Sequence, residues 1–222
     1  MRDTMRYTPT PVSDVSHGTA EKGRLTCPVR LFHGRTARRY NEAMSGPQPV
    51  LAAGRSCANC TMCCKVLTIP ELEKPGNQWC SHCDIGKGCK IYAERPQTCA
   101  GFFCLYLSDA AISEHWKPSH SRMVMSSDAG GLYIHVDPAR ADAWRKEPYY
   151  TELKTWARNF AQRNVMTIVL VGESLTAILP DRDKHLGRQD PRNSLRLMKR
   201  AGPRGPEYDV EVYDPQTGAA VT

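Results

Sequence analysis

Hydrophobic and polar residues alternate most clearly in the second half of the chain, where the pattern predicts two β-hairpins. Residues 122–125 and 132–136 are largely apolar runs, and each predicts a strand. The Asp-Ala-Gly-Gly sequence at 128–131 supplies turn residues between them. These two strands are therefore expected to pair as a hairpin.

The next apolar runs predict a second hairpin, from residues 167–171 and 174–179. Its turn is Gly172-Glu173, and a glycine in the first position suits a type II′ turn, which needs a positive φ there. Farther along, residues 208–213 alternate between apolar and polar types, which predicts a final strand at the edge of a sheet.

Two helices are predicted between these hairpins. Asp137-Pro138 is an N-cap followed by a proline in the first helical position, which opens a short helix to about Arg145. A longer helix begins at Pro148, because the apolar residues that follow recur at i, i+3, i+4 and i+7. The residues of this apolar face are Leu153, Trp156, Ala157 and Phe160.

Earlier in the chain the pattern is weaker, and only short elements are expected. Residues 65–69 predict a strand that ends before Pro70. Residues 90–94 predict a single helical turn. Residues 108–116 predict a short helix that Pro118 ends.

These elements predict an α+β fold, in which a small irregular cysteine-rich module precedes β-hairpins packed with two or three short helices. Residues 1–43 are expected to be a disordered N-terminal extension, since they show little pattern. Residues 44–120 form the cysteine module, which is expected to bind metal. Residues 121–180 complete the same domain as an α+β region, and residues 181–222 are expected to be a basic polar tail with the edge strand.

Composition places the chain among globular proteins. Of its 222 residues, 41% are hydrophobic and 24% are charged. It contains no run of 18 apolar residues, so no membrane insertion is expected. The first 30 residues lack the apolar core of a secretory signal, which predicts a cytoplasmic protein with reduced thiols.

The net charge of +7 is concentrated in two segments. Residues 1–43 hold eight Lys/Arg against four Asp/Glu, and residues 181–206 hold eight against three. Basic arms can bind a polyanion such as a nucleic acid. Because no nucleic-acid motif accompanies the charge, solvated ends are the favoured interpretation.

The strongest chemical signal is the cysteines, because nine of the ten lie between residues 57 and 104. Disulfides are disfavoured, since nine is an odd number and a chain of this length needs no cross-links. Spacings of C-x2-C recur, and such a loop lets two thiolates bind one ion. The candidate metal ligands are Cys57, Cys60, Cys63, Cys64, Cys80, Cys83, Cys89, Cys99 and Cys104.

The sequence leaves the metal open between an iron–sulfur cluster and zinc. The C-x2-C-x2-C run that starts at Cys57 is similar to the bacterial ferredoxin run, although Lys65 stands in place of the ferredoxin proline. Structural zinc would instead use separated pairs, with Cys80/Cys83 as one of them. Neighbouring side chains such as Cys63 and Cys64 diverge, which favours two metals, or one metal and a spare thiol. The lone His82 is not expected to be a ligand.

The residues also resemble a known family. The run Cys57-x2-Cys60-x2-Cys63-Cys64, followed by Gly88-Cys89-x2-Tyr92-x2-Arg95-Pro96-x2-Cys99, resembles the YkgJ-type cysteine-cluster family, the zinc- or iron-chelating CxxCxxCC domain. The resemblance covers residues 50–120 and implies metal chelation by the cysteines. It implies no single reaction, because some members are labelled iron–sulfur oxidoreductases and a flagellin lysine methylase is similar over the motif. Two residues of this motif are expected beside the cofactor, Arg95 to offset thiolate charge and Tyr92 to exclude water.

Three functions are therefore expected from the sequence. The first is an iron–sulfur protein of redox or group-transfer chemistry, and the C-x2-C-x2-C run favours an iron–sulfur cluster slightly over zinc. The second is a zinc-stabilised module that binds a protein or a nucleic acid, and the third is a protein that handles zinc or iron.

Overall fold

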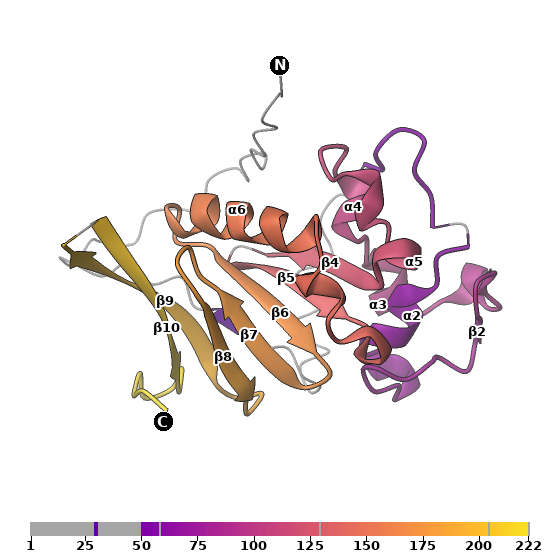
Figure 1. Ribbon diagram of the computed structural model, residues 1–222. Helices are drawn as coiled ribbons and strands as arrows, with labels where there is room; N and C mark the ends of the chain where they lie inside the picture. Colours follow the sequence, from indigo (N-terminus) through magenta and orange to yellow (C-terminus); the bar gives the residue numbers. More distant parts are fainter. Residues whose placement is uncertain (1–28, 31–49, 58, 129, 204, 222) are drawn as a thin grey trace, which may run out of the picture.

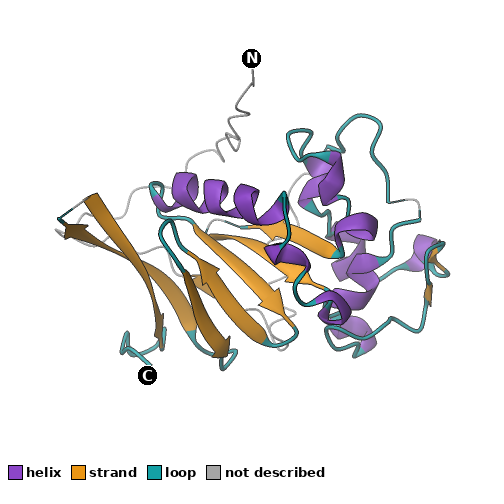
Figure 2. Ribbon diagram, in the orientation of Figure 1, coloured by secondary structure: helices purple, strands orange, loops and turns teal. Residues whose placement is uncertain are grey.

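The structure is a computed structural model that describes residues 29–30, 50–57, 59–128, 130–203 and 205–221 (Figure 1). Figure 2 shows short helices gathered at one end and strands in sheets through the rest, which confirms the α+β class. The expected N-terminal extension, with Cys27, lies almost wholly outside the described residues.

The centre of the fold is a five-stranded sheet in the order β4-β5-β6-β7-β8. Both predicted hairpins are confirmed, as the antiparallel pairs β4/β5 and β6/β7, and Gly172 in the second turn has the expected positive φ of 62°. The middle pair β5/β6 is parallel, and the chain between them forms α6. The bounds are β4 Met123–Ser127, β5 Gly131–Val136, α6 Tyr149–Ala161, β6 Met166–Val171, β7 Ser174–Ile178 and β8 Asp183–Arg188.

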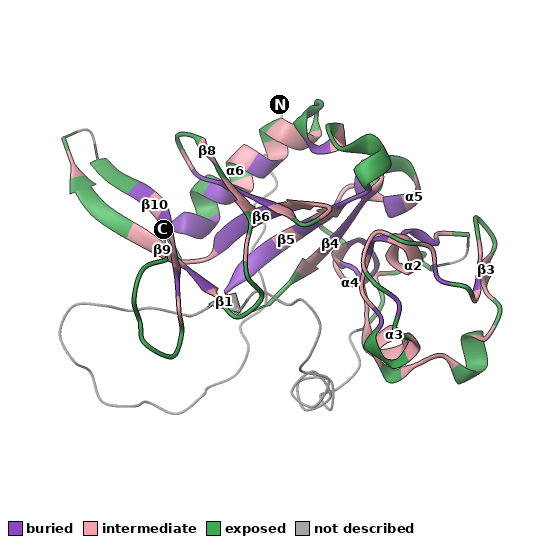
Figure 3. Cartoon of the chain, turned by 90° about the horizontal axis from the view of Figure 1, so that it is seen from below, coloured by how far each residue is buried: buried purple, intermediate pink, exposed green. Residues whose placement is uncertain are grey.

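Both faces of this sheet are covered. Along β5, Leu132 and Ile134 pack in the main core with α6 and with helices of the cysteine module. The intervening Tyr133 faces the opposite side and packs in a second core that includes Leu195 and Val210. A strand places successive side chains on opposite faces, so these two cores lie on the two sides of the sheet. Figure 3 shows the buried residues concentrated along its inner strands.

The second core is closed by a three-stranded sheet in the order β1-β9-β10, which corrects the expected polar tail. Residues 181–206 contribute β8 and β9, and residues 205–213 form an edge strand, as the alternation predicts. The bounds are β1 Val29–Arg30, β9 Ser194–Gly202 and β10 Gly205–Tyr213.

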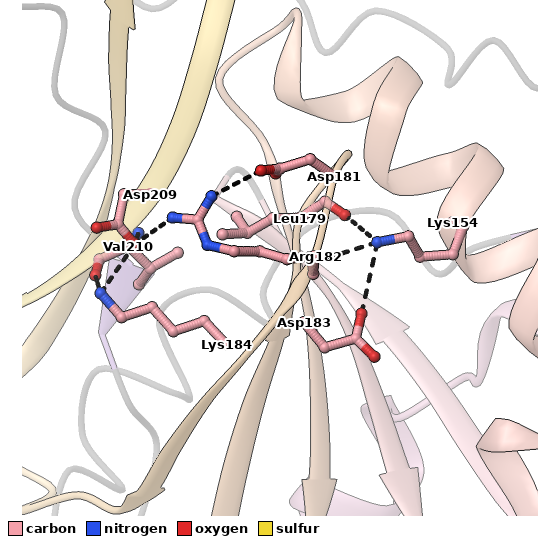
Figure 4. Close-up of polar contacts among 8 residues, drawn as sticks. All are labelled: Lys154, Leu179, Asp181, Arg182, Asp183, Lys184, Asp209 and Val210. Carbon is pink, nitrogen blue, oxygen red and sulfur yellow. Dashed lines mark hydrogen bonds and ion pairs between the residues drawn. The ribbon is translucent and has the colours of Figure 1, made fainter.

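The basic residues of this segment are used within the fold, because acidic residues lie beside them. Lys184 bonds to the carboxylate of Asp209 and to the carbonyl of Val210, both at 2.8 Å, which ties β8 to β10 (Figure 4). Lys154 of α6 bonds to the carbonyl of Leu179 and pairs with Asp183, the first residue of β8, which ties α6 to the start of that strand. Of the seven Lys/Arg of residues 181–206 that the structure describes, five form ion pairs, namely Arg182, Lys184, Arg188, Arg192 and Arg196.

The cysteine module consists of short helices and a two-stranded hairpin that pack at the β4 end of the sheet (Figure 1). Its α-helices are α2 Met62–Val66, α3 Gln97–Gly101, α4 Leu105–Ser108 and α5 Pro118–Ser121. Its 3-10 helices are η1 Pro70–Leu72, η2 Tyr92–Glu94 and η3 Glu114–Trp116, and its hairpin is β2 Cys83–Asp84 with β3 Gly88–Cys89. Two further 3-10 helices, η4 Pro138–Arg140 and η5 Ala143–Arg145, divide the helix expected after Asp137.

Two expected elements of the module are wrong. Residues 65–69 are not a strand, because α2 runs to Val66 and buries Met62 and Val66 one helical turn apart in the main core. Residues 108–116 are not one helix, because α4 already ends at Ser108, and Arg55 donates to the carbonyls of Tyr106 and Asp109 on either side of this end. Pro118 does not end a helix but begins α5, since the first helical position needs no N–H donor.

Candidate metal centre

Three segments of backbone bring the central cysteines together. Cys63 and Cys64 lie in α2, and the N–H of Cys80 bonds to the carbonyl of Cys64 at 3.1 Å. A turn then returns the N–H of Cys83 to the carbonyl of Cys80 at 3.0 Å. The loop after α2 therefore folds back on the helix and places the C-x2-C pair beside the CxxCxxCC run.

A hairpin adds another cysteine to this group. Cys83 in β2 lies directly opposite Cys89 in β3, and residues opposite one another in an antiparallel pair project to the same face. The tip of the hairpin is fixed to α2, because the N–H of Gly86 donates to the hydroxyl of Thr61 at 3.2 Å. The hydroxyl of Thr61 also bonds to the thiol of Cys83, and this contact favours the thiolate.

Cys64 is the centre of the thiol contacts. Hydrogen bonding to Cys63 lowers the pKa of the Cys64 thiol to about 6, against the opposing effect of burial, and contacts with Cys83 and Lys74 lower it further. The same bond raises the pKa of Cys63 well above its usual value, since Cys63 is the donor. Burial and the neighbouring Cys64 raise the pKa of Cys83 to about 11. One thiolate is thus held by two protonated thiols at neutral pH.

A buried cation, Lys74, lies beside this group. Its side chain is only 7% exposed, and its ammonium donates to the carbonyls of Lys65 and Leu67 at the end of α2. Burial lowers the pKa of Lys74, while the charges of nearby cysteines raise it in part. The cysteines that act on it are Cys80, Cys64, Cys63 and Cys99. Lys74 therefore supplies a positive charge where several thiolates would gather.

Six of the nine described cysteines pack in two apolar clusters. Cys80 and Cys83 pack in a small cluster with Ile69, against which Cys64 and Cys99 also lie. Burial raises the pKa of Cys99 to about 11, followed by repulsion from Cys64.

The second set belongs to the main core, where Cys104 is buried and Cys60 packs against it. Burial raises the pKa of Cys104 to about 11, with a smaller contribution from Cys60 and Cys57. Cys57 is exposed, and after burial the charge of Cys60, followed by that of Cys64, raises its pKa, so it belongs with Cys60 but also lies near the first set. All nine cysteines within the described residues carry free thiols.

In this arrangement the thiols do not yet form a completed metal site. Across the part of the chain that the structure describes, no group of three or more Cys, His, Asp or Glu side chains is arranged to hold a metal ion. The expectation that Cys63 and Cys64 diverge is also modified, since their thiols share a hydrogen bond despite their adjacent positions.

The two predicted accessory residues, Arg95 and Tyr92, contact each other. Arg95 stacks over the ring of Tyr92, with its guanidinium carbon 3.9 Å from the ring centroid, and its charge acts on Cys57. Tyr92 is 57% exposed, so it does not shield the cysteines from water.

Sequence reasoning missed Lys74 and Thr61. Lys74 lies in a polar loop of the sequence, where an exposed lysine is the ordinary expectation. The available signal was a lysine between two groups of cysteines, since a dense set of thiolates needs a nearby positive charge. Thr61 lies inside the CxxCxxCC run, where its hydroxyl gave no separate signal.

The longest described helix, α6, has 13 residues. No helix in the described part of the chain is long and apolar enough to cross a membrane. Comparison of the chain with protein-family models, with curated proteins and with solved structures finds no match. The resemblance to the YkgJ-type family therefore depends on the motif residues alone.

Proposed function

We propose that the cysteine module binds metal through its thiolates, as an iron–sulfur cluster ahead of zinc. The observation that carries this proposal is the contact of Cys64 with both Cys63 and Cys83, which come from α2 and β2. Ordinary packing does not require three thiols from two separate segments to bond to one another. A site for a soft metal does bring thiols from separate segments together, because thiolates are its preferred ligands.

The chemistry of the donors fits such a group. A bound metal replaces thiol protons, and the Cys64 thiol already has a pKa of about 6, so ligation at this position costs little at neutral pH. Lys74 adds a positive charge that offsets the negative charge of further thiolates. Because no three side chains form a finished site, we infer that metal binding is accompanied by rotation of the thiol side chains.

Two sets of ligands are assigned in this proposal. The first consists of Cys63, Cys64, Cys80, Cys83 and Cys99, and the second of Cys57, Cys60 and Cys104, with Cys89 beside the first through the β2/β3 hairpin. An iron–sulfur cluster would supply electron transfer at this place, whereas zinc would supply structural stability. The apolar residues around the first set, among them Ile69, would limit the access of water to it.

The test is a metal analysis with an absorption spectrum on protein purified without oxygen. Iron and sulfide in stoichiometric amounts, with visible absorption, are the expected result. Stoichiometric zinc in a colourless protein would replace the iron–sulfur assignment by zinc. Protein that contains neither metal, and cannot be loaded with either after reduction, would contradict metal binding altogether.

A further inference from the structure

A cavity of about 260 Å³ lies at the junction of the second cysteine set with α4 and α5. It has room for about eight water molecules at about 30 Å³ each, and therefore for a small organic molecule. Cys60 forms part of its wall, so an occupant would lie beside a cysteine that we assign as a metal ligand.

The charge of the wall is one-sided. Arg55, Lys117 and His120 line the cavity, and none of the described lining residues is an aspartate or a glutamate. One carboxylate, that of Glu114, contacts the wall, because it accepts a hydrogen bond from the hydroxyl of the lining residue Tyr106 at 2.5 Å. This bond, followed by the charges of Lys117, Arg55 and His120, lowers the pKa of Glu114 against the opposing effect of burial. Glu114 is therefore ionised, but its single negative charge offsets only part of the positive charge of the wall.

Arg55 is held rigidly in this wall. Its guanidinium donates to the carbonyls of Tyr106, Asp109 and Ile112 at 2.5 to 2.8 Å, and its carbon lies 4.4 Å from the centroid of the Tyr106 ring. These bonds use three of the five N–H groups of the guanidinium and fix the position of its charge. A cation that is ordered before the ligand arrives loses little conformational entropy on binding.

The remaining polar groups of the wall can donate hydrogen bonds. Lys117 makes a single long ion pair, with 3.7 Å between its nitrogen and Glu114, so its ammonium has donors to spare. Ser56, Asn59 and Ser119 add hydroxyl and amide donors around the same space. A concave site with several donors and an excess of positive charge suits an oxygen anion.

We propose that this cavity binds a small organic anion through a carboxylate or phosphate group, held by Arg55, Lys117 and His120. The anion would lie against Cys60, which places it beside the proposed metal and makes it a candidate substrate or effector of that centre. Anion binding itself does not depend on the metal, because the groups that hold the anion are not cysteines.

The experiment is calorimetric titration of the full chain with inorganic phosphate and, separately, with succinate, at constant ionic strength. The test variant is Lys117→Gln combined with His120→Gln, since both side chains are at least partly exposed and neither is needed for the core. Lys146→Gln is the matched control, because Lys146 is exposed and does not line the cavity. Arg55 is left unchanged, as its loss would also disturb α4.

We expect saturable binding of at least one probe, weakened by about tenfold in the double variant, since charge-assisted bonds are lost. The control should bind as the unchanged protein does. Absence of saturable binding with both probes, or equal weakening in Lys146→Gln, would overturn the proposal. The same titration after removal of any metal separates the two proposals, because binding in metal-free protein supports the cavity whatever the metal analysis finds.

Discussion

Lys65 and Asp137 join the cysteine module to the central sheet through an ion pair of 2.6 Å between Nζ and Oδ1. Lys65 follows Cys64 in α2, whereas Asp137 follows the last residue of β5 and has no exposed side-chain surface. The other oxygen of Asp137 accepts from Arg122 at 2.7 Å, and the N–H of Ala139 donates to Oδ1 at 3.0 Å. The position of α2, which carries Cys63 and Cys64, is thus fixed by a buried carboxylate.

Replacement of Asp137 by asparagine should destabilise the fold. The amide leaves Lys65 and Arg122 without their counter-charge, and loss of one partner from a buried ion pair costs about 3 kcal/mol. Urea denaturation should show this decrease in the free energy of unfolding. Asp142→Asn is the control, since Asp142 is exposed, and a similar decrease in both variants would contradict the role of the buried pair.

The same residue predicts an acid limit to stability. Burial raises the pKa of Asp137, but the bonds from Lys65, Ala139 and Arg122 outweigh burial and hold the pKa below 3.8. A lowered folded-state pKa gives a contribution that is complete above the unfolded value and is lost as the pH falls through the folded one. The stability difference between the protein and Asp137→Asn should therefore shrink below about pH 3.8. A constant difference down to pH 2 would contradict this.

Lys74 should contribute to the reactivity of the Cys64 thiol by lowering its pKa. Hydrogen bonding to Cys63 is the main cause of the low pKa of Cys64, and the charge of Lys74 adds to it. In reduced, metal-free protein, alkylation of Cys64 should therefore rise with a midpoint near pH 6. Lys74→Met should move this midpoint to higher pH, as mapped by mass spectrometry of the peptides.

Lys90→Met is the control for that measurement, because Lys90 is an exposed cation of the same module. Its midpoint should equal that of the unchanged protein. If the two variants shifted alike, the effect would come from net charge and not from the position of Lys74.

Thr61 should hold the β2/β3 hairpin against α2. Thr61→Val keeps the shape of the side chain but leaves the N–H of Gly86 without its acceptor and removes the bond to Cys83. We expect a loss of about 1 kcal/mol in unfolding free energy. Thr61→Ser retains the hydroxyl and should lose much less, so equal losses would refute the hydrogen-bonding role.

The two cysteine sets predict separate losses of metal. Cys99→Ser removes a ligand of the first set and Cys60→Ser one of the second, and each should lower the metal-to-protein ratio and the melting temperature, since binding is coupled to folding. Cys27→Ser, at a position outside the described residues, should change neither quantity. Unchanged metal content and melting in both test variants would rule out the assignment.

The elements that the sequence predicts well are those with a strong local pattern. The alternation in residues 132–136 and the turn at Gly172 determine their hairpins within a few residues, and the apolar stripe of α6 needs no distant partner. These signals are local, so they can be identified before the fold is known.

The predictions that were wrong depend on partners far away in the sequence. Arg196 contributes to the basic character of 181–206, yet it lies directly opposite Glu211 in the β9/β10 ladder and pairs with it. Similarly, Arg188 pairs with Glu173 of the preceding turn. A count of charges cannot show which charged residues face one another. The segment predicted as a polar tail therefore forms strands whose basic residues have acidic partners.

For the candidate site, the sequence identified the nine thiols but not their neighbours. The bond from Cys80 to the carbonyl of Cys64 closes a loop of intervening residues, and the position of Lys74 follows from that closure. Spacing along the chain determines which cysteines can bind one ion as a local pair. Contacts between pairs depend on tertiary structure.

The packing of the module on β4 has a consequence for the fate of newly made chains. β4 is the outermost strand of its sheet, its residues Met123–Met125 are all buried, and α2, α4 and α5 contact it. Open sheet edges act as templates for aggregation, which proteins prevent by covering them. If metal binding stabilises the module, a cell short of that metal would contain more chains in which the module opens and leaves this edge uncovered. The supply of metal would then influence how much of the protein aggregates.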